Sequence, residues 1–191
     1  MNVLPLNITK RQKIVNKTHK KDTLKKRSFI DIEKHLEKSV LAKCRISTKG
    51  KILFCNSDFI ENSGYSQKEI SNQNIDVISH PEMPKIIQMV IHNNLGNNLP
   101  ILSIVKHLSK DLRYYWTLSE YAPNTNENNL KTAYTIISKP ITHQTKQKIA
   151  KLYDVLIKIE KNHDVVMASK YLIGFLEQKG MSYSEYIKSI L

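Results

Sequence analysis

The sequence has little of what common enzyme classes place around a reactive group. Of its 191 residues only five are glycine and two are cysteine. It contains no glycine-rich phosphate loop, no His-Glu-x-x-His pair, no Cys-x-x-Cys pair and no Gly-x-Ser-x-Gly turn. Enzymes that depend on these motifs are therefore excluded, and we expect a protein without catalytic activity.

Other absences indicate in which cellular compartment the protein is expected. Cys44 and Cys55 do not have the spacing of a metal site, so we expect reduced thiols, with a disulfide between adjacent strands as the alternative. No run of about 18 apolar residues is present, which argues against a transmembrane helix. The first residues have no apolar stretch behind a basic start, so we expect no signal peptide. These features predict a cytoplasmic protein.

Positive charge is abundant but unevenly distributed. The formal net charge is +13, and residues 1–27 hold nine lysines and arginines against one acid, Asp22. With so few apolar residues to bury, this stretch is predicted to be a disordered basic tail. Contact with an acidic partner, an anionic membrane surface or nucleic acid is the functional alternative. The tail has no aromatic residue, so base stacking is not expected.

Helical and strand patterns begin directly after the tail. Phe29, Ile32 and Leu36 recur at helical spacing and predict one short amphipathic helix. Residues 40–55 are typical of a β-hairpin with a turn at Lys49-Gly50.

Three helical signals then precede three further strands. The helical signals are the capping residue Asn56 with a stop at Gly64, the capping box Ser66–Glu69, and a longer helix opened by His80-Pro81 and ended by Gly96. The strand patterns cover residues 100–108, 112–121 and 130–138. This order predicts an α+β fold, in which a five-stranded antiparallel sheet carries short helices on one face.

The pattern after Pro140 is helical. An apolar stripe at alternating spacings of three and four is formed by Ile149, Leu152, Leu156 and Ile159. The predicted organisation is a basic tail (1–27), a sheet domain with its N-terminal flanking helix (28–142) and a C-terminal helical segment (143–191). We expect the flanking helices to bury their stripes against each other, a second copy in a homodimer, or a partner. Packing onto their own sheet is the alternative.

Three segments carry family-like motifs. Residues 56–66 (NSDFIENSGYS) resemble the N-x-x-F-x-x-x-[ST]-G-Y-[ST] signature of PAS domains. Residues 80–85 (HPEMPK) resemble the R-H-P-D-M-P-K motif in the PAS domain of bacterial aerotaxis receptors, and Ile104-Val105-Lys106 with Tyr114-Tyr115-Trp116 resembles a hairpin of the same domain. The resemblance covers roughly residues 40–140, and it implies the PAS fold.

The resemblance also implies a cofactor. Aerotaxis PAS domains bind FAD, and the positions that match assign Asn56, His80, Glu82 and Trp116 to the flavin pocket. Ser79 and Ile101 stand where the family has arginine and tryptophan, so we expect flavin binding to be weak.

Three of these residues also have a reading without flavin. Asn56 is well placed to cap a helix, and Trp116 has the alternation of a core strand residue. His80 could orient the turn at Pro81 or, as in some PAS domains, ligate haem. We therefore keep FAD, haem and no cofactor as alternatives.

The function that these patterns favour is that of a non-enzymatic PAS sensor or adaptor. By resemblance it would sense redox state or energy supply and signal to a partner such as a chemotaxis-type receptor. One alternative is a ligand-free scaffold for protein assembly. The other is a nucleic-acid-binding regulator that uses residues 1–27.

Overall fold

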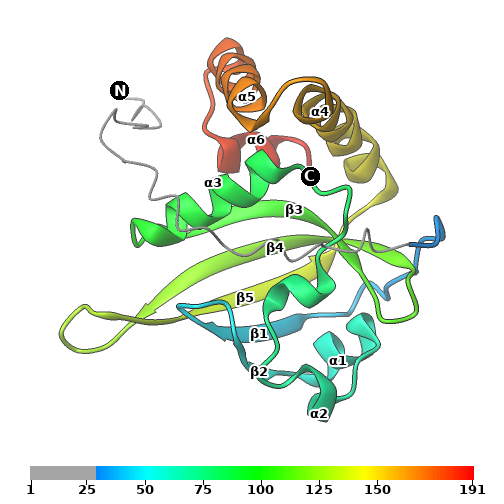
Figure 1. Ribbon diagram of the computed structural model, residues 1–191, viewed down its shortest axis with the longest axis vertical. Helices are drawn as coiled ribbons and strands as arrows, with labels where there is room; N and C mark the ends of the chain where they lie inside the picture. Colours follow the sequence, from blue (N-terminus) through cyan, green and yellow to red (C-terminus); the bar gives the residue numbers. More distant parts are fainter. Residues whose placement is uncertain (1–28) are drawn as a thin grey trace.

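The computed structural model describes residues 29–191 and has one sheet and six α-helices in that range (Figure 1). The strands are β1 Ala42–Ser47, β2 Ile52–Cys55, β3 Ile101–Leu108, β4 Tyr114–Thr125 and β5 Lys131–Pro140. The helices are α1 Ser57–Ser63, α2 Gln67–Ile70, α3 Lys85–Gly96, α4 His143–Asn162, α5 Val165–Lys179 and α6 Tyr183–Ser189, with a 3₁₀ helix η1 at Ile75–Ile78. The predicted basic tail lies outside the described residues.

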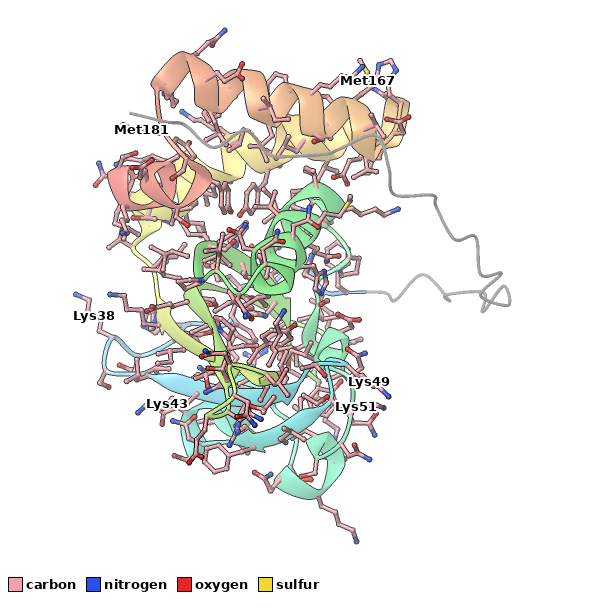
Figure 2. All side chains as sticks on the ribbon, turned by 90° about the vertical axis from the view of Figure 1, so that its left-hand side faces the viewer. Lys38, Lys43, Lys49, Lys51, Met167 and Met181 are labelled. Carbon is pink, nitrogen blue, oxygen red and sulfur yellow. The ribbon has the colours of Figure 1, made fainter. Side chains whose placement is uncertain are left out.

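The predicted five-stranded antiparallel sheet is confirmed. Its order is β2-β1-β5-β4-β3, and every neighbouring pair is antiparallel. Along β1, buried Ala42, Cys44 and Ile46 alternate with exposed residues, so the sheet has an inner face toward α1, η1 and α3 and an outer face. Figure 2 shows Lys43 of β1 and Lys51 of the hairpin projecting on opposite sides of the molecule.

Asn56 joins the sheet to the first helix. It is the N-cap of α1, and its Oδ1 accepts hydrogen bonds from the backbone N–H groups of Phe59 (3.1 Å) and Lys43 (2.8 Å). Its Nδ2 donates to the carbonyl oxygen of Leu41 (2.9 Å). One side chain therefore sets the start of α1 against β1, which orients the buried residues of α1: Phe59, Asn62 and Ser63.

The C-terminal helices pack onto their own domain. The stripe of α4 is buried, with Ile149 and Leu156 both at 0% exposure, in a cluster that includes residues of α3, β3, α5 and α6. In Figure 1 these helices lie together at the β3 side of the sheet. Of the alternatives for this stripe, packing within the chain is thus the one observed.

Polar groups on α4 and α6 also close the free edge of β3. The Tyr153 hydroxyl donates to the carbonyl oxygen of Ile104 (2.6 Å), and the backbone N–H of Leu102 donates to Ser184 Oγ (3.2 Å). The Tyr183 hydroxyl bonds both Tyr153 (2.7 Å) and Ser103 Oγ (2.9 Å). An exposed edge strand would otherwise offer unpaired backbone groups to other chains.

The predicted helix at residues 29–36 is wrong, because this segment is extended. It runs beside the start of β4: Ile30 donates its N–H to Leu112 O (2.8 Å), and Tyr114 donates to Ile32 O (3.0 Å). Only Leu36 of the predicted stripe is buried, while Ile32 is 54% exposed. A helix this short has a costly nucleus and needs tertiary packing, whereas strand-like pairing gives the same backbone groups partners at once.

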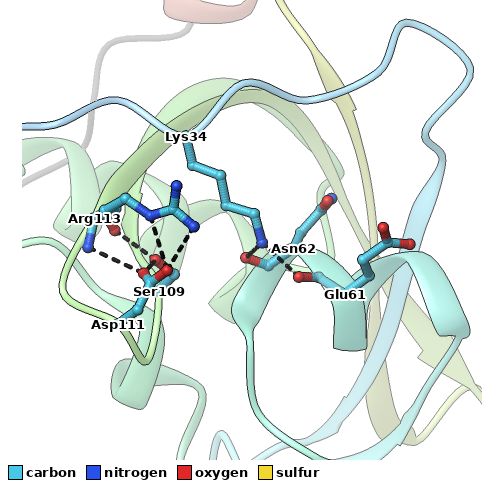
Figure 3. Close-up of polar contacts among 6 residues, drawn as sticks. All are labelled: Lys34, Glu61, Asn62, Ser109, Asp111 and Arg113. Carbon is cyan, nitrogen blue, oxygen red and sulfur yellow. Dashed lines mark hydrogen bonds and ion pairs between the residues drawn. The ribbon is translucent and has the colours of Figure 1, made fainter.

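Side chains anchor this extended segment to α1. Lys34 Nζ donates to the carbonyl oxygens of Glu61 (2.6 Å) and Asn62 (3.1 Å), at the C-terminal end of α1, where a cation complements the helix dipole. Figure 3 shows this contact beside the Asp111–Arg113 ion pair of the β3–β4 turn. The same view shows the Asn62 side-chain amide directed away from Lys34.

The cap at Asn56 generates a stability prediction. We expect Asn56→Ala to lower the free energy of unfolding by about 1–2 kcal/mol, because the N-cap bond and the two bonds to β1 are lost together. The measurement is urea unfolding followed by circular dichroism. Asn128→Ala, at an exposed asparagine of the β4–β5 loop, is the matched control and should change little. Equal effects of the two changes would contradict the structural role of Asn56.

The packing of α4 gives a second prediction. We expect Leu156→Ala to cost about 2–5 kcal/mol, because it leaves a cavity at a fully buried position. Val166→Ala, at a position that is 57% exposed, should change stability by less than about 0.5 kcal/mol. Thermal unfolding combined with mass in solution distinguishes the two interpretations of the stripe. A stable Leu156→Ala variant with altered mass would indicate an interface instead of a core.

Candidate functional site

A cavity of about 360 Å³ lies between the inner face of the sheet and the helices α1, η1 and α3. Its volume is at the lower end of the range for small-molecule sites. Aromatic and aliphatic side chains form most of the wall, including Tyr115, Tyr121 and Tyr134 from the sheet and Phe59 and Ile91 from the helices. Such walls suit an apolar or flat ligand body, so the polar groups among them decide what else the cavity accepts.

The sheet contributes a continuous row of buried polar groups. His107 Nε2 lies 3.0 Å from Thr117 Oγ1, which lies 2.8 Å from Ser119 Oγ, which in turn lies 2.8 Å from Ser138 Oγ. The other ring nitrogen of His107 bonds the backbone at Ile78. Because a carbonyl oxygen can only accept, we assign the proton to Nδ1, so that Nε2 accepts from Thr117 and the hydroxyls point in sequence toward the histidine.

Burial keeps two histidines near the site uncharged. It lowers the pKa of His107 to about 4, with a further contribution from His80, and it lowers the pKa of His80 to about 4 with a contribution from Lys106. At neutral pH the buried polar row on the sheet side of the cavity is therefore uncharged. Lys49 and Asp76, which also border the cavity, are exposed.

Asn62 contributes a buried polar group to the helical wall. The residue is 4% exposed and lines the cavity from the last turn of α1. Its Nδ2 is buried and has no hydrogen-bond partner among residues 29–191. A buried amide donor without a hydrogen-bond partner lowers the stability of the folded chain. Among the described residues that line the cavity, no other buried side-chain nitrogen or oxygen lacks a partner.

Three of the four predicted site residues meet around Lys106. Lys106 Nζ lies 2.9 Å from Glu82 Oε2 and 6.0 Å from the centre of the Trp116 ring. His80 adjoins the group, since its ring centre lies 5.8 Å from that of Tyr114, and Lys106 Nζ lies 4.3 Å from the same tyrosine ring. Lys106 is 8% exposed, so this shell of one carboxylate and aromatic rings compensates a largely buried charge.

The predicted residues are not themselves part of the cavity wall. Lys106 borders the cavity, whereas Asn56, His80, Glu82 and Trp116 do not. Trp116 pairs with Lys106 across the strands and packs against Tyr153 of α4, with ring centres 6.1 Å apart. Asn56 is engaged in the cap of α1. Whether any of them contacts a ligand stays a prediction.

His80 has one bonded and one unbonded ring nitrogen. Nδ1 accepts the backbone N–H of Glu82 (3.1 Å), which is the turn-orienting role considered for it, and Phe29 packs edge-on against the ring at 4.5 Å. Nε2 is buried and has no partner within the described part of the chain. Among those residues no group of three or more His, Cys, Asp or Glu could hold a metal ion, and no helix is long and apolar enough to cross a membrane.

Sequence reasoning missed the polar groups that do line the cavity. The signal that could have found the row was small polar residues at alternate positions of strands, since Thr117 and Ser119 share one face of β4 and Ser138 pairs with Ser119. Asn62 had no such signal, because it occupies a variable position of the signature motif.

The two neutral histidines predict acid sensitivity. Their pKa values are lower in the folded chain than the ordinary 6.5, so their stabilising contribution is complete above pH 6.5 and is lost as the pH falls toward about 4. For His107 the loss is about 3 kcal/mol at most. Unfolding measured across this window should show a smaller loss for His107→Gln than for the parent or for His163→Gln, a change at an exposed histidine. Identical profiles for all three would refute a neutral buried His107.

Comparisons with known proteins agree with this geometry. The aerotaxis receptor of Escherichia coli (strain K12) is 28% identical over 105 residues, which are 55% of this chain and 21% of the receptor. The chain thus matches only about a fifth of that relative's length.

Solved structures share the fold at low identity. A PAS domain from Colwellia psychrerythraea is 21% identical with a TM-score of 0.50, and the match covers 54% of this chain and 87% of that domain. A light-oxygen-voltage domain studied with a flavin analogue is 16% identical with a TM-score of 0.53, covering 58% and 84%.

The sequence model of the PAS fold matches residues 32–134, just over half of the chain. That interval contains β1 to β4, the first four residues of β5 and every residue named above as lining the helical side of the cavity. The chain therefore belongs to the PAS family.

Proposed function

We propose that this protein is a PAS sensor whose cavity takes a small molecule and whose state is read by a signalling partner. The observation that carries the proposal is the cavity itself: it lies between the sheet and the helices, is walled largely by aromatic and aliphatic side chains and contains a few polar groups. This combination is the usual form of a small-molecule site. It belongs to a PAS domain similar to that of an aerotaxis receptor, which supports a role in signalling.

The ligand proposed on grounds of resemblance is FAD. The lining suits the flat ring of a flavin in kind, because Tyr115, Tyr121 and Tyr134 offer aromatic surface and Asn62 offers an amide at the edge. A volume of about 360 Å³ suits one ring system better than a complete dinucleotide. When bound, a flavin would supply a redox-active ring, and the chain's residues would hold and shield it.

The four residues assigned by resemblance then act indirectly. Asn56 orients α1, which carries Asn62 into the wall. Glu82 and Trp116 hold the ammonium group of Lys106, and Lys106 borders the cavity. In this proposal they position groups that meet the ligand.

The route of output proposed here runs through β3. This strand borders the cavity through Val105 and His107, and it is also hydrogen-bonded to tyrosine hydroxyls of the C-terminal helices, Tyr153 and Tyr183. A ligand that moves β3 would therefore change the bonds that hold α4 and α6. Energy-taxis or redox sensing, with a chemotaxis-type receptor as the partner, is the specific form that the aerotaxis resemblance supports.

A second candidate is a ligand-free scaffold, and the outer sheet face favours it. Leu53 and Phe54 of β2 are 54% and 57% exposed, next to the exposed cations Lys43 and Arg45 of β1. None of the ion pairs between described residues uses these two cations. Like charges disfavour a second copy on this face, so an acidic protein surface is the partner that fits. Contacts made by residues 1–27 stay predictions.

The decisive experiment is reconstitution with FAD followed by gel filtration and an absorption spectrum. We expect the parent protein to retain weakly bound flavin and Val105→Phe to lose most of it, because the larger side chain occupies the cavity. Leu53→Phe, an enlargement at an exposed position of the sheet, should bind like the parent.

Two results would contradict the flavin proposal. If the parent retains no flavin at any FAD concentration tested, the ligand is wrong and the scaffold becomes the better candidate. If folded Val105→Phe retains as much as the parent, the flavin binds outside this cavity. A haem band in the absorption spectrum of the purified protein would indicate that the ligand is haem and not FAD.

A further inference from the structure

Asn62 is a polar side chain whose burial is not explained by the fold. Its backbone carbonyl receives Lys34, so the main chain at this position is already anchored. Its side-chain Nδ2, in contrast, is buried with no partner among residues 29–191, at a residue only 4% exposed. An apolar side chain of the same size would remove that penalty, so the amide costs stability where it stands.

The cavity offers the Asn62 amide a place to meet a hydrogen-bond acceptor. Asn62 lines the cavity, and Figure 3 shows its side chain leaving α1 on the side away from Lys34. Rotation about the last side-chain bond of asparagine has a broad profile, so the NH₂ group can turn toward the cavity at little cost. The group needs an acceptor, and a ligand carbonyl oxygen is the natural one.

The opposite wall specifies the rest of the ligand. In the row on the sheet, Ser138 donates to Ser119, Ser119 donates to Thr117, and Thr117 donates to His107. The hydroxyl protons are therefore all used, and what remains free on these oxygens are lone pairs that can accept a hydrogen bond. Ser138 and Thr117 both border the cavity. A ligand N–H can therefore be accepted on the sheet side while a carbonyl is bound on the helical side.

The interior also selects against charge. His107 is neutral at pH 7. Of the two lysines that border the cavity, Lys106 is already paired with Glu82 at 2.9 Å, and Lys49 is exposed. A charged ligand would lose its hydration without gaining a free counter-charge in the deep part of the cavity. The other buried residues of the lining are apolar, whereas its other polar residues, such as Gln88 and Asp76, are half-buried or exposed.

We propose that Asn62 is the specificity-determining residue of the cavity, and that it selects an uncharged ring compound carrying a lactam or imide group. This proposal rests on the sensor function proposed above and narrows its ligand. It includes the flavin ring as one member of a chemical class. It differs from the assignment by resemblance, because the selecting residue lies in α1.

Two probes of similar shape test the proposal on the full chain. Lumichrome is an uncharged tricyclic ring with an imide, and phenazine is a tricyclic ring without a carbonyl group. We expect the parent protein to bind lumichrome at least about tenfold more tightly than phenazine, measured by fluorescence or calorimetric titration. Asn62→Leu should remove this preference and leave phenazine binding unchanged or stronger.

A stability readout separates selection from a structural role. Free of probe, Asn62→Leu should unfold at the same temperature as the parent or higher, since the unpaired amide is gone. Asn93→Leu, at an exposed asparagine of α3, controls for added hydrophobicity. Should Asn62→Leu fail to fold, Asn62→Ala gives the same comparison of the two probes.

Each outcome decides the matter. Lost preference with retained stability supports the proposal. Equal lumichrome binding by the parent and Asn62→Leu overturns it while leaving a cavity-type sensor intact. If the parent binds neither probe, the ligand class is wrong, and the FAD experiment with Val105→Phe then decides separately whether the cavity binds a flavin at all. A marked loss of stability in both Asn62 variants would make the residue structural.

Discussion

Buried polar groups on the inner face of the sheet have to be hydrogen-bonded, and much of this structure depends on that constraint. Thr117, Ser119 and Ser138 occupy core-facing positions where strands commonly carry valine or isoleucine. They satisfy one another and end on the acceptor nitrogen of His107, so no water or charge is needed within the row. Because these side chains are short, they also leave space in front of the sheet, and the helices bridge that space instead of filling it.

The helices α4–α6 make this open core stable. They bury an apolar cluster with α3 and β3, and this cluster includes the cavity-lining residues Ile91, Leu95 and Val105. Their tyrosine hydroxyls bond β3 at Ser103 and Ile104, so the strand that borders the cavity is held from the side opposite to its partner β4. The strand β3 therefore belongs both to the wall of the cavity and to the surface that the C-terminal helices cover.

The sequence was a good guide wherever local chemistry decides the structure. Alternation of apolar residues identified the strands, the position of Asn56 identified a helix cap, and the stripe of α4 identified a buried face. The segment at residues 29–36 failed because its helical spacing had no surface to pack on, while the backbone of Tyr114 offered it direct pairing. Helical periodicity alone does not decide between these outcomes in so short a segment.

The candidate site was harder to predict, because it depends on which side of a strand each residue faces. Trp116 and Tyr115 are neighbours in one motif, yet Tyr115 lines the cavity with its strand partner His107, whereas Trp116, which pairs with Lys106, does not border the cavity. A motif match identifies both residues equally well and says nothing of this division. The pairing Lys106–Trp116 shows its consequence: a family-like tryptophan serves here to accommodate a lysine, whose charge is compensated by Glu82 and by aromatic rings. Selection in the cavity is thereby left to neutral groups, the asparagine on α1 and the hydroxyl row on the sheet.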